Sequence, residues 1–273
     1  MGATIRVNIV PDKTSYGDII IAMLSSQDYH GFEEDGTTIV AFIKEELFGE
    51  AILKETLSQF SKHYTWMVIP YQNWNAIWES EYEPVLIEDF VHVRAIFHPV
   101  NTSAKYDIII TPKMSFGTAH HATTVLMIRQ MQDIDCSNKQ VLDFGTGTGI
   151  LAILAAKLGA EIVVAIDIDN HSIENAKENV LVNHIENVVL QQRDSVEDSG
   201  KFDIVLANIN LHIIMQNLEA MSEILNESGV LVLSGFLLQD EEILLHKSRE
   251  LGLVLKKKVE KDGWCCLKLQ RHI

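Results

Sequence analysis

The chain of 273 residues is 47% hydrophobic and carries a formal net charge of −16, which allows one large packed domain and a smaller one and excludes an intrinsically disordered chain. This negative charge repels phosphate backbones and attracts basic partners, so we expect no autonomous binding to nucleic acid. The sequence shows neither a secretion signal nor an apolar run of about 18 residues, and its cysteines (Cys136, Cys265 and Cys266) lack the spacing of a disulfide framework or a zinc site, so we expect a cytoplasmic protein that does not bind membranes.

The first 70 residues are predicted to form a small α+β domain. Strand patterns and helical spacing follow one another in the order strand, helix, strand, helix, strand over residues 4–10, 15–24, 37–43, 46–60 and 64–69. Pro70 ends the last of these runs. Strands and helices that alternate over so short a span predict a ferredoxin-like domain.

An aromatic stripe follows this domain. Trp74, Ile77, Trp78 and Tyr82 stand at positions i, i+3, i+4 and i+8, so a helix here would present them on one face. The spacing predicts a linker helix over residues 71–84 that packs on a domain. The alternative is that the stripe grips a substrate.

The remaining residues, 85–273, are predicted to form one larger α/β domain. Strand-like runs at 90–97 and 106–110 lead into a polar segment that precedes a helix near Thr123. Five apolar runs then alternate with helical spacing, at residues 140–144, 161–166, 188–190, 202–207 and 230–233. Runs that are apolar on both faces predict a parallel sheet covered by helices on both sides. The last two strands are separated by only four residues, so they should form an antiparallel hairpin.

A glycine-rich turn follows the first of these apolar runs. Gly145, Gly147 and Gly149 let a ligand approach the backbone, and the amides of the following helix can hold a carboxylate. Asp143 precedes the turn by two residues and would add a favourable field for a cationic ligand. Because many strand-to-helix turns contain glycine for steric reasons alone, a purely structural turn is the alternative.

Three polar residues at later strand ends extend the predicted ligand site. Asp167, eighteen residues beyond Gly149, can accept hydrogen bonds from both hydroxyls of a ribose. Asp194 is either an acceptor for the adenine amino group or a turn residue. Asn208 ends the fourth core strand, where its side-chain oxygen can accept a hydrogen bond from a target amine. Together they predict an adenosine site.

The spacing of the turn argues against a dinucleotide. Ile150 follows the third glycine directly, whereas the dinucleotide fingerprint has its third glycine or alanine one position later. His120 and His121 have no Asp, Glu or Cys at a spacing that would complete a metal site, so we predict loop roles for them and no metal.

The chain resembles the PrmA-type methyltransferases, which methylate a protein of the stalk base of the large ribosomal subunit. The resemblance covers nearly the whole chain and is carried by the core motifs Asp143-Phe-Gly-Thr-Gly-Thr-Gly-Ile-Leu-Ala, Ile166-Asp-Ile-Asp and Ala207-Asn-Ile, by the linker Trp74-Asn-Ala-Ile-Trp, and by the loop Phe116-Gly-Thr-Ala-His-His-Ala-Thr-Thr. It implies a class I S-adenosylmethionine methyltransferase fold, Rossmann-like, at 85–273. It also implies that residues 1–70 recognise the substrate.

The same resemblance implies site residues and an activity. It places cofactor contacts at Thr124, Gly145, Asp167 and Asn208, and Asn208 would also orient the target amine. The activity would be S-adenosylmethionine-dependent N-methylation of lysine and N-terminal amines of a basic ribosomal protein. Two departures from the family pattern stand out, and both replace a residue that the family usually has: Ala119 stands for a glycine in the loop, and Asn210 for an apolar residue after Ala-Asn-Ile.

Other functions remain compatible with these motifs. A methyltransferase of the same fold could act on a small molecule or on RNA. A nucleotide-binding dehydrogenase and a noncatalytic binding module are further alternatives, against which the turn spacing and the intact Gly145, Asp167 and Asn208 argue, respectively.

Overall fold

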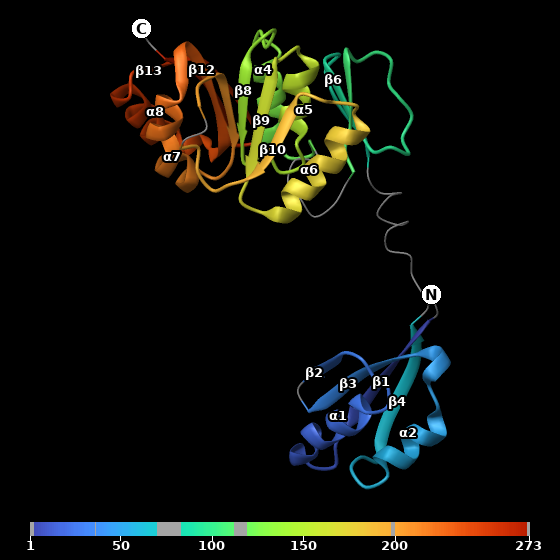
Figure 1. Cartoon of the computed structure of the whole chain (residues 1–273). Coiled ribbons are helices and arrows are strands. Elements are labelled where there is room, and N and C mark those ends of the chain that lie inside the picture. Colours follow the sequence, from blue (N-terminus) through green and yellow to red (C-terminus); the bar gives the residue numbers. More distant parts are fainter. Residues whose placement is uncertain (1–2, 36, 70–82, 112–118, 198–199, 272–273) are drawn as a thin grey trace. The chain divides into compact units, whose positions relative to one another are not determined.

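The computed structural model describes residues 3–35, 37–69, 83–111, 119–197 and 200–271. The chain divides into two compact units, Met1–Glu81 and Tyr82–Ile273 (Figure 1). The predicted linker helix over residues 71–84 falls almost entirely outside the described residues. None of the described helices is long and apolar enough to cross a membrane.

The small unit has the predicted ferredoxin-like topology. Its elements are β1 (Thr4–Val10), α1 (Gly17–Ser25), β2 (Phe32–Asp35), β3 (Thr38–Lys44), α2 (Glu50–Leu57) and β4 (His63–Ile69), with short 3-10 turns at Thr14–Tyr16 and Glu45–Leu47. The strands form one antiparallel sheet in the order β2-β3-β1-β4. The sequence prediction missed β2, and the predicted helix over 46–60 is shorter because Gly49 caps α2.

Alternation along β1 builds the core of the small unit. Ile5, Val7 and Ile9 are fully or almost fully buried, whereas the side chains between them face the other side of the sheet. Ile20 and Leu24, four residues apart on α1, are buried against them. The two helices therefore cover one face of the sheet, and no other helix of residues 3–35 and 37–69 covers the opposite face.

The large unit is built on a seven-stranded sheet. Its strands are β8 (Gln140–Phe144), β9 (Ile162–Asp167), β10 (Val188–Gln192), β11 (Phe202–Asn208), β12 (Leu225–Leu237), β13 (Leu253–Lys261) and β14 (Trp264–Arg271). They lie in the order β10-β9-β8-β11-β12-β14-β13. β14 runs in the opposite direction to the other six strands, which confirms the predicted parallel sheet with an antiparallel terminal hairpin.

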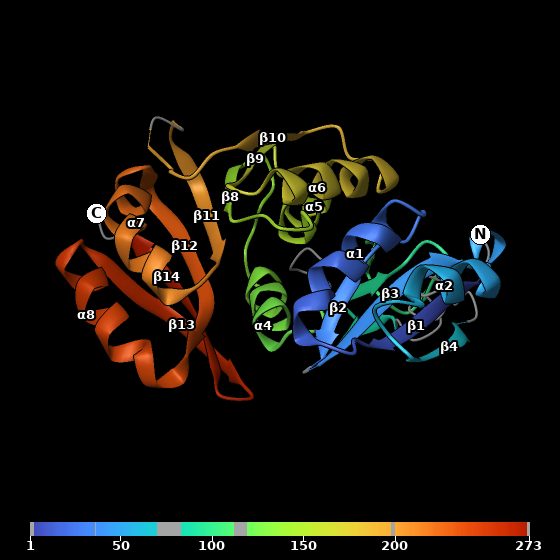
Figure 2. The ribbon, with the colours of Figure 1, turned by 90° about the horizontal axis from the view of Figure 1, so that it is seen from below.

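Helices cover both faces of this sheet, as the apolar strands predict. They are α4 (Ala122–Met131), α5 (Ile150–Lys157), α6 (Asn170–Val182), α7 (Leu211–Glu223) and α8 (Glu241–Glu250), with a 3-10 turn at Leu238–Asp240. In β8, Val141 packs with the cluster that contains α4 and α5, and Leu142 packs with the cluster that contains α7 and α8. Figure 2 shows these two pairs of helices on opposite sides of the sheet.

A three-stranded sheet precedes the large one. It consists of β5 (Val85–Ile87), β6 (Val91–Arg94) and β7 (Tyr106–Ile109), and its apolar side chains join the α4–α5 core. The predicted strand over 90–97 was too long, because β6 ends at Arg94. Beyond it the chain turns, with the His98 amide donating to the Ala95 carbonyl and the Arg94 guanidinium to the His98 carbonyl.

The strand order positions the site. The chain leaves β8 toward β9 on one side and later returns to β11 on the other, so β8 and β11 lie side by side with a change of winding direction between them. The carboxyl ends of parallel strands meet at one edge of the sheet, and ligands of such sheets bind there.

Candidate functional site

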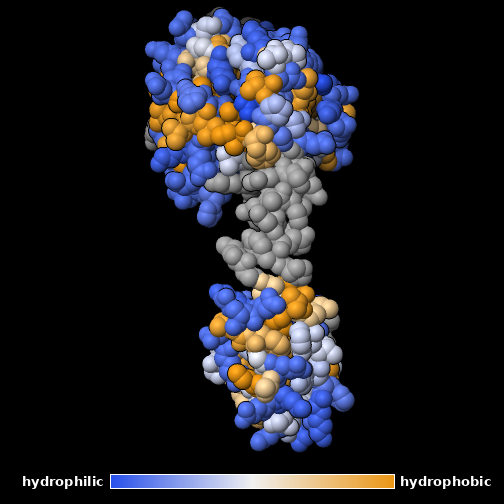
Figure 3. Space-filling view, turned by 90° about the vertical axis from the view of Figure 1, so that its right-hand side faces the viewer, coloured by the Kyte–Doolittle hydropathy of each residue, from blue (hydrophilic) through white to orange (hydrophobic). Residues whose placement is uncertain are grey.

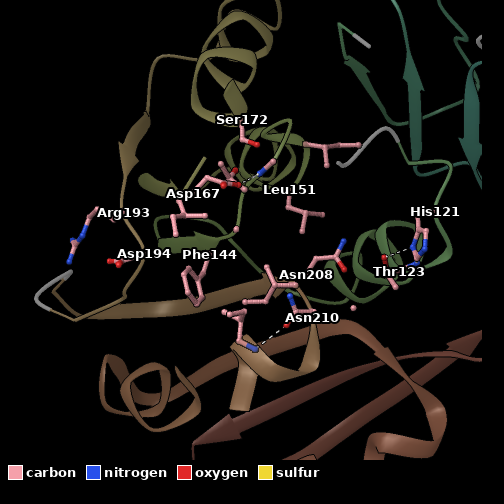
Figure 4. A pocket seen from close by; sticks show the side chains of 18 of the residues that line it. His121, Thr123, Phe144, Leu151, Asp167, Ser172, Arg193, Asp194, Asn208 and Asn210 are labelled. Atoms are coloured by element: carbon pink, nitrogen blue, oxygen red, sulfur yellow. Dashed lines mark hydrogen bonds between the residues drawn. The ribbon is translucent and has the colours of Figure 1, made fainter. Parts of the chain in front are cut away.

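A cavity of about 590 Å³ lies at this edge of the sheet, a size in the range of small-molecule sites. Five of the predicted site residues line it: Gly145, Gly147, Asp167, Asp194 and Asn208. They come from the ends of β8, β9 and β11 and from the segment after β10, and Figure 4 shows Asp167, Asp194 and Asn208 around the same space.

The glycine turn and Asp167 form one hydrogen-bonded unit. The amides of Gly145 and Thr146 donate to the Ile166 carbonyl at 2.9 and 3.0 Å. The Gly147 amide donates to Asp167 Oδ2 at 2.9 Å, and the Asp169 amide donates to Oδ1 at 3.0 Å. A carboxylate can accept about four hydrogen bonds, so Asp167 is held in place and keeps capacity for two more. Two neighbouring ribose hydroxyls would match that capacity.

Gly149 and Asp143 lie behind the cavity and do not line it. A Cβ at Gly149, whose φ is +81°, would lie 3.2 Å from Ala176 Cβ, so this glycine allows α5 to approach α6. Asp143 is almost completely buried and accepts a hydrogen bond from Thr146 Oγ1 at 2.6 Å. Burial raises the pKa of Asp143 to about 7.

The side chain of Asn208 has one partner and one open acceptor. Its Nδ2 donates to Thr124 Oγ1 at 3.4 Å. Its Oδ1 is buried and has no hydrogen-bond partner among the described residues. Thr124 is itself fully buried in the first turn of α4, so it supports Asn208 without lining the cavity. A buried acceptor without a donor is costly unless a ligand supplies one.

Two glycines make room for the backbone that follows Asn208. A Cβ on Gly145 would overlap Cγ2 of Ile209, and a Cβ on Gly235 would lie 2.7 Å from the Ile209 carbonyl carbon. Gly235 has a φ of +97° at an irregularity in β12 and lines the cavity. Gly235 was not among the residues predicted from the sequence, although a glycine inside a strand indicates a bulge or a close backbone approach.

Other missed residues form the walls. Ile168 follows Asp167, is 70% exposed and lines the cavity, so its side chain offers an apolar surface to a ligand there. His121 caps α4 by accepting a hydrogen bond from the Thr123 amide. Its ring packs edge-on against Trp264, with the two ring centroids 4.8 Å apart. Both residues line the cavity.

The two departures from the family pattern differ in their local effect, since Asn210 adds a helix cap and Ala119 adds backbone strain. Asn210 caps α7, and its side-chain oxygen accepts from the Ile213 amide at 3.1 Å, which an apolar residue could not do. Ala119 is buried with a φ of +65°. This left-handed conformation favours glycine and costs alanine about 1 kcal/mol.

The residues present fit an adenosyl ligand with a cationic end. Asp167 offers acceptors for ribose, Ile168 offers an apolar face for a base, and Asp194 borders the same cavity. At the other end, the open Oδ1 of Asn208 provides a separate acceptor.

Comparison with known proteins agrees with this geometry. The model of the family "Ribosomal protein L11 methyltransferase (PrmA)" matches residues 13–272. Ribosomal protein L11 methyltransferases of Phocaeicola vulgatus and Porphyromonas gingivalis are 34% and 38% identical, with 94% of this chain and 95% and 91% of those proteins covered. The crystal structure of ribosomal protein L11 methylase from Lactobacillus delbrueckii subsp. bulgaricus is 29% identical, with a TM-score of 0.65, and covers 70% of this chain and 100% of that one.

Proposed function

Because this chain belongs to the ribosomal protein L11 methyltransferase (PrmA) family of S-adenosylmethionine-dependent enzymes, we propose that it methylates amino groups of ribosomal protein L11. The single observation that carries the proposal is the open, buried Oδ1 of Asn208 beside a cavity lined by Asp167 and the glycine turn. One end of the cavity thus suits an adenosine, and the other can receive an amine.

S-adenosylmethionine supplies an electrophilic methyl group when it is bound. Asp167 would hold the ribose hydroxyls, and Asp194 would accept from the adenine amino group. Gly145 and Gly147 allow close approach of the methionine end to the backbone, and Asp143 beneath them favours positive charge there once ionised.

Asn208 would orient the acceptor amine. Its Oδ1 can accept one N–H of a neutral amine, which directs the nitrogen lone pair away from Asn208 and toward the methyl donor. Thr124 keeps the amide in this orientation by accepting from Nδ2. In-line transfer depends mainly on such positioning, so no dedicated general base is required.

Lysine is the proposed acceptor, together with the N-terminal amine. A lysine of pKa near 10.4 must lose its proton before it reacts, at a cost of about 4 kcal/mol at neutral pH, whereas an α-amine costs about 1 kcal/mol. Much of the cavity wall is apolar, including Phe144, Leu151, Ile209 and Trp264. Such surroundings disfavour the charged amine and lower its pKa.

The acidity of the chain suits this substrate. A formal charge of −16 attracts a basic ribosomal protein and repels RNA. We therefore favour the protein over RNA or a small molecule as acceptor. The site of action would be the cytoplasm, where ribosomes are assembled.

The test is methylation of unmodified L11, followed by mass spectrometry of the protein product. We expect methyl groups on lysine or on the N-terminal amine, and turnover about 5- to 30-fold lower for Asn208→Ala, because about 1–2 kcal/mol of positioning is lost. Asn217→Ala on α7, outside the cavity, is the matched control. Transfer to RNA or metabolites but not to L11 would contradict the proposal.

A further inference from the structure

Strand β4 forms one edge of the small unit's sheet. It is seven residues long and, among the described strands, pairs only with β1, in a register that is continuous from Thr4–Ile69 to Val10–His63. Its outer side therefore presents unpaired backbone N–H and C=O groups without a bulge to interrupt them.

Apolar side chains are exposed on both faces of this edge. Trp66, Met67, Val68 and Ile69 are 39%, 53%, 45% and 38% exposed. Trp66 and Val68 pair across to the buried Val7 and Ile5, so they lie on the helix side, and Met67 and Ile69 lie on the open side. Figure 3 shows hydrophobic surface at the end of the small unit where β4 leads into the grey segment.

Two other edges of the described sheets carry charge, whereas the edge strands β10 and β5 carry none. At the opposite edge of the same sheet, β2 has the exposed Glu33. In the large unit, edge strand β13 has Lys256, Lys257 and Lys258. Such charges prevent unwanted strand addition, and β4 has none between Tyr64 and Ile69.

We propose that β4 is the docking edge for the basic protein substrate, which adds an extended segment to this sheet. This inference rests on the proposed function. The cavity of about 590 Å³ has room for a cofactor and a side chain, so a protein substrate needs a second contact surface. Backbone groups of β4 would give affinity, and its apolar side chains would select alternate residues of the added strand.

Charge decides between a partner protein and a second copy of this chain. Two copies would each carry −16 and repel each other, whereas a basic partner is attracted. Acidic residues also outnumber basic ones within residues 1–69, the part that contains β4. The uncharged edge thus lies in an acidic unit, which favours a basic occupant.

The test compares Met67→Lys and Met67→Glu with Ile52→Lys, a control on α2 that is 59% exposed in the same unit. Strand addition predicts that both changes at Met67 raise the KM for L11 by about tenfold, with kcat and cofactor affinity unchanged. The control should keep its KM. An unchanged KM in both Met67 variants would overturn the proposal, as would a lower KM for Met67→Glu, which would indicate a purely electrostatic contact.

Hydrogen exchange of the unaltered protein provides a second measurement. Amides of residues 64–69 should exchange more slowly when L11 is added. If the protein methylates L11 without this protection, docking at β4 is wrong and the proposed function stands. If it does not methylate L11, both are wrong. A dimer in light scattering, with β4 amides already protected in the absence of L11, would assign the edge to a second copy and overturn the inference.

Discussion

The carboxyl group of Asp143 is an ionisable group buried beneath the glycine turn. Burial raises its pKa to about 7, above the value near 3.9 in an unfolded chain. Between these values the folded protein keeps a proton that the unfolded chain has released, so this group makes the free energy of unfolding fall as the pH rises from about 4 to about 7.

Asp143→Asn should remove this dependence because an amide does not ionise. Relative to the unaltered protein, we expect the variant to gain about 2–3 kcal/mol in free energy of unfolding between pH 5 and pH 8. Urea unfolding without cofactor at the two pH values measures this gain. An equal difference between the two proteins at both pH values would refute the assigned ionisation.

Gly235 offers a second test at the residue scale. A Cβ there would collide with the Ile209 backbone, so we expect Gly235→Ala to shift Asn208 and to lower kcat at least ~10-fold, with a smaller effect on cofactor affinity. Gly252→Ala is the control, since Gly252 also has a positive φ but nothing within 4 Å of a Cβ. Equal losses in both variants would show that backbone strain alone is responsible.

The sequence predicted which strand ends build the site but not which side chains reach the cavity. Gly145, Asp167 and Asn208 follow from spacing along the chain. Gly149, expected from the glycine turn, and Thr124, implied by the family resemblance, do not line the cavity. Neither source tells whether a residue near a strand end faces a ligand or a packed helix. The walls formed by Trp264 and Gly235 come from strands distant in sequence.

At the scale of elements, α6 ties β7 to the glycine turn through buried asparagines. Asn179 accepts from the Thr111 amide and donates to the Thr148 carbonyl, both at 2.8 Å. Asn183, one turn later, accepts a hydrogen bond from the Ile109 amide and donates one to the Ile109 carbonyl. These contacts fix Thr111 and Ile109 relative to the glycine turn that lines the cavity.

Asn179→Ala should therefore destabilise the large unit by about 2–4 kcal/mol, because it leaves a backbone N–H and a C=O without partners in a partly or fully buried position. Asn170→Ala, at the exposed start of the same helix, should change stability by less than about 0.5 kcal/mol. Urea unfolding of both variants provides the comparison. A loss below about 1 kcal/mol for Asn179→Ala would mean that its two hydrogen bonds to Thr111 and Thr148 contribute little to stability.

Most elements followed from periodicity, and the exceptions have physical causes. β2 was missed because acidic residues, which have low strand propensity, fill three of its four positions. Pairing with β3 stabilises this strand. The strand expected over 90–97 ends early because Arg94 stabilises a turn after it. Tertiary contacts decide both cases, and a single sequence does not display them.

For the whole molecule, the net charge makes substrate binding sensitive to salt. An acidic enzyme and a basic protein attract each other over a distance that ionic strength shortens. We expect the KM for L11 to rise at least ~3-fold between about 50 and about 300 mM salt, while the affinity for S-adenosylhomocysteine changes little. Steady-state kinetics at both salt concentrations measures the effect, and an unchanged KM would leave the charge of −16 without a part in recognition.

S-adenosylmethionine is proposed to bind in the cavity at the ends of β8, β9 and β11. Calorimetric titration with S-adenosylhomocysteine tests this proposal most directly, since this product binds without reacting. We predict saturable binding at one site per chain and affinity at least ~10-fold weaker for Asp167→Ala, in which the ribose acceptors are gone. No binding by the folded protein, or full affinity in Asp167→Ala, would show that S-adenosylmethionine does not bind in this cavity as proposed.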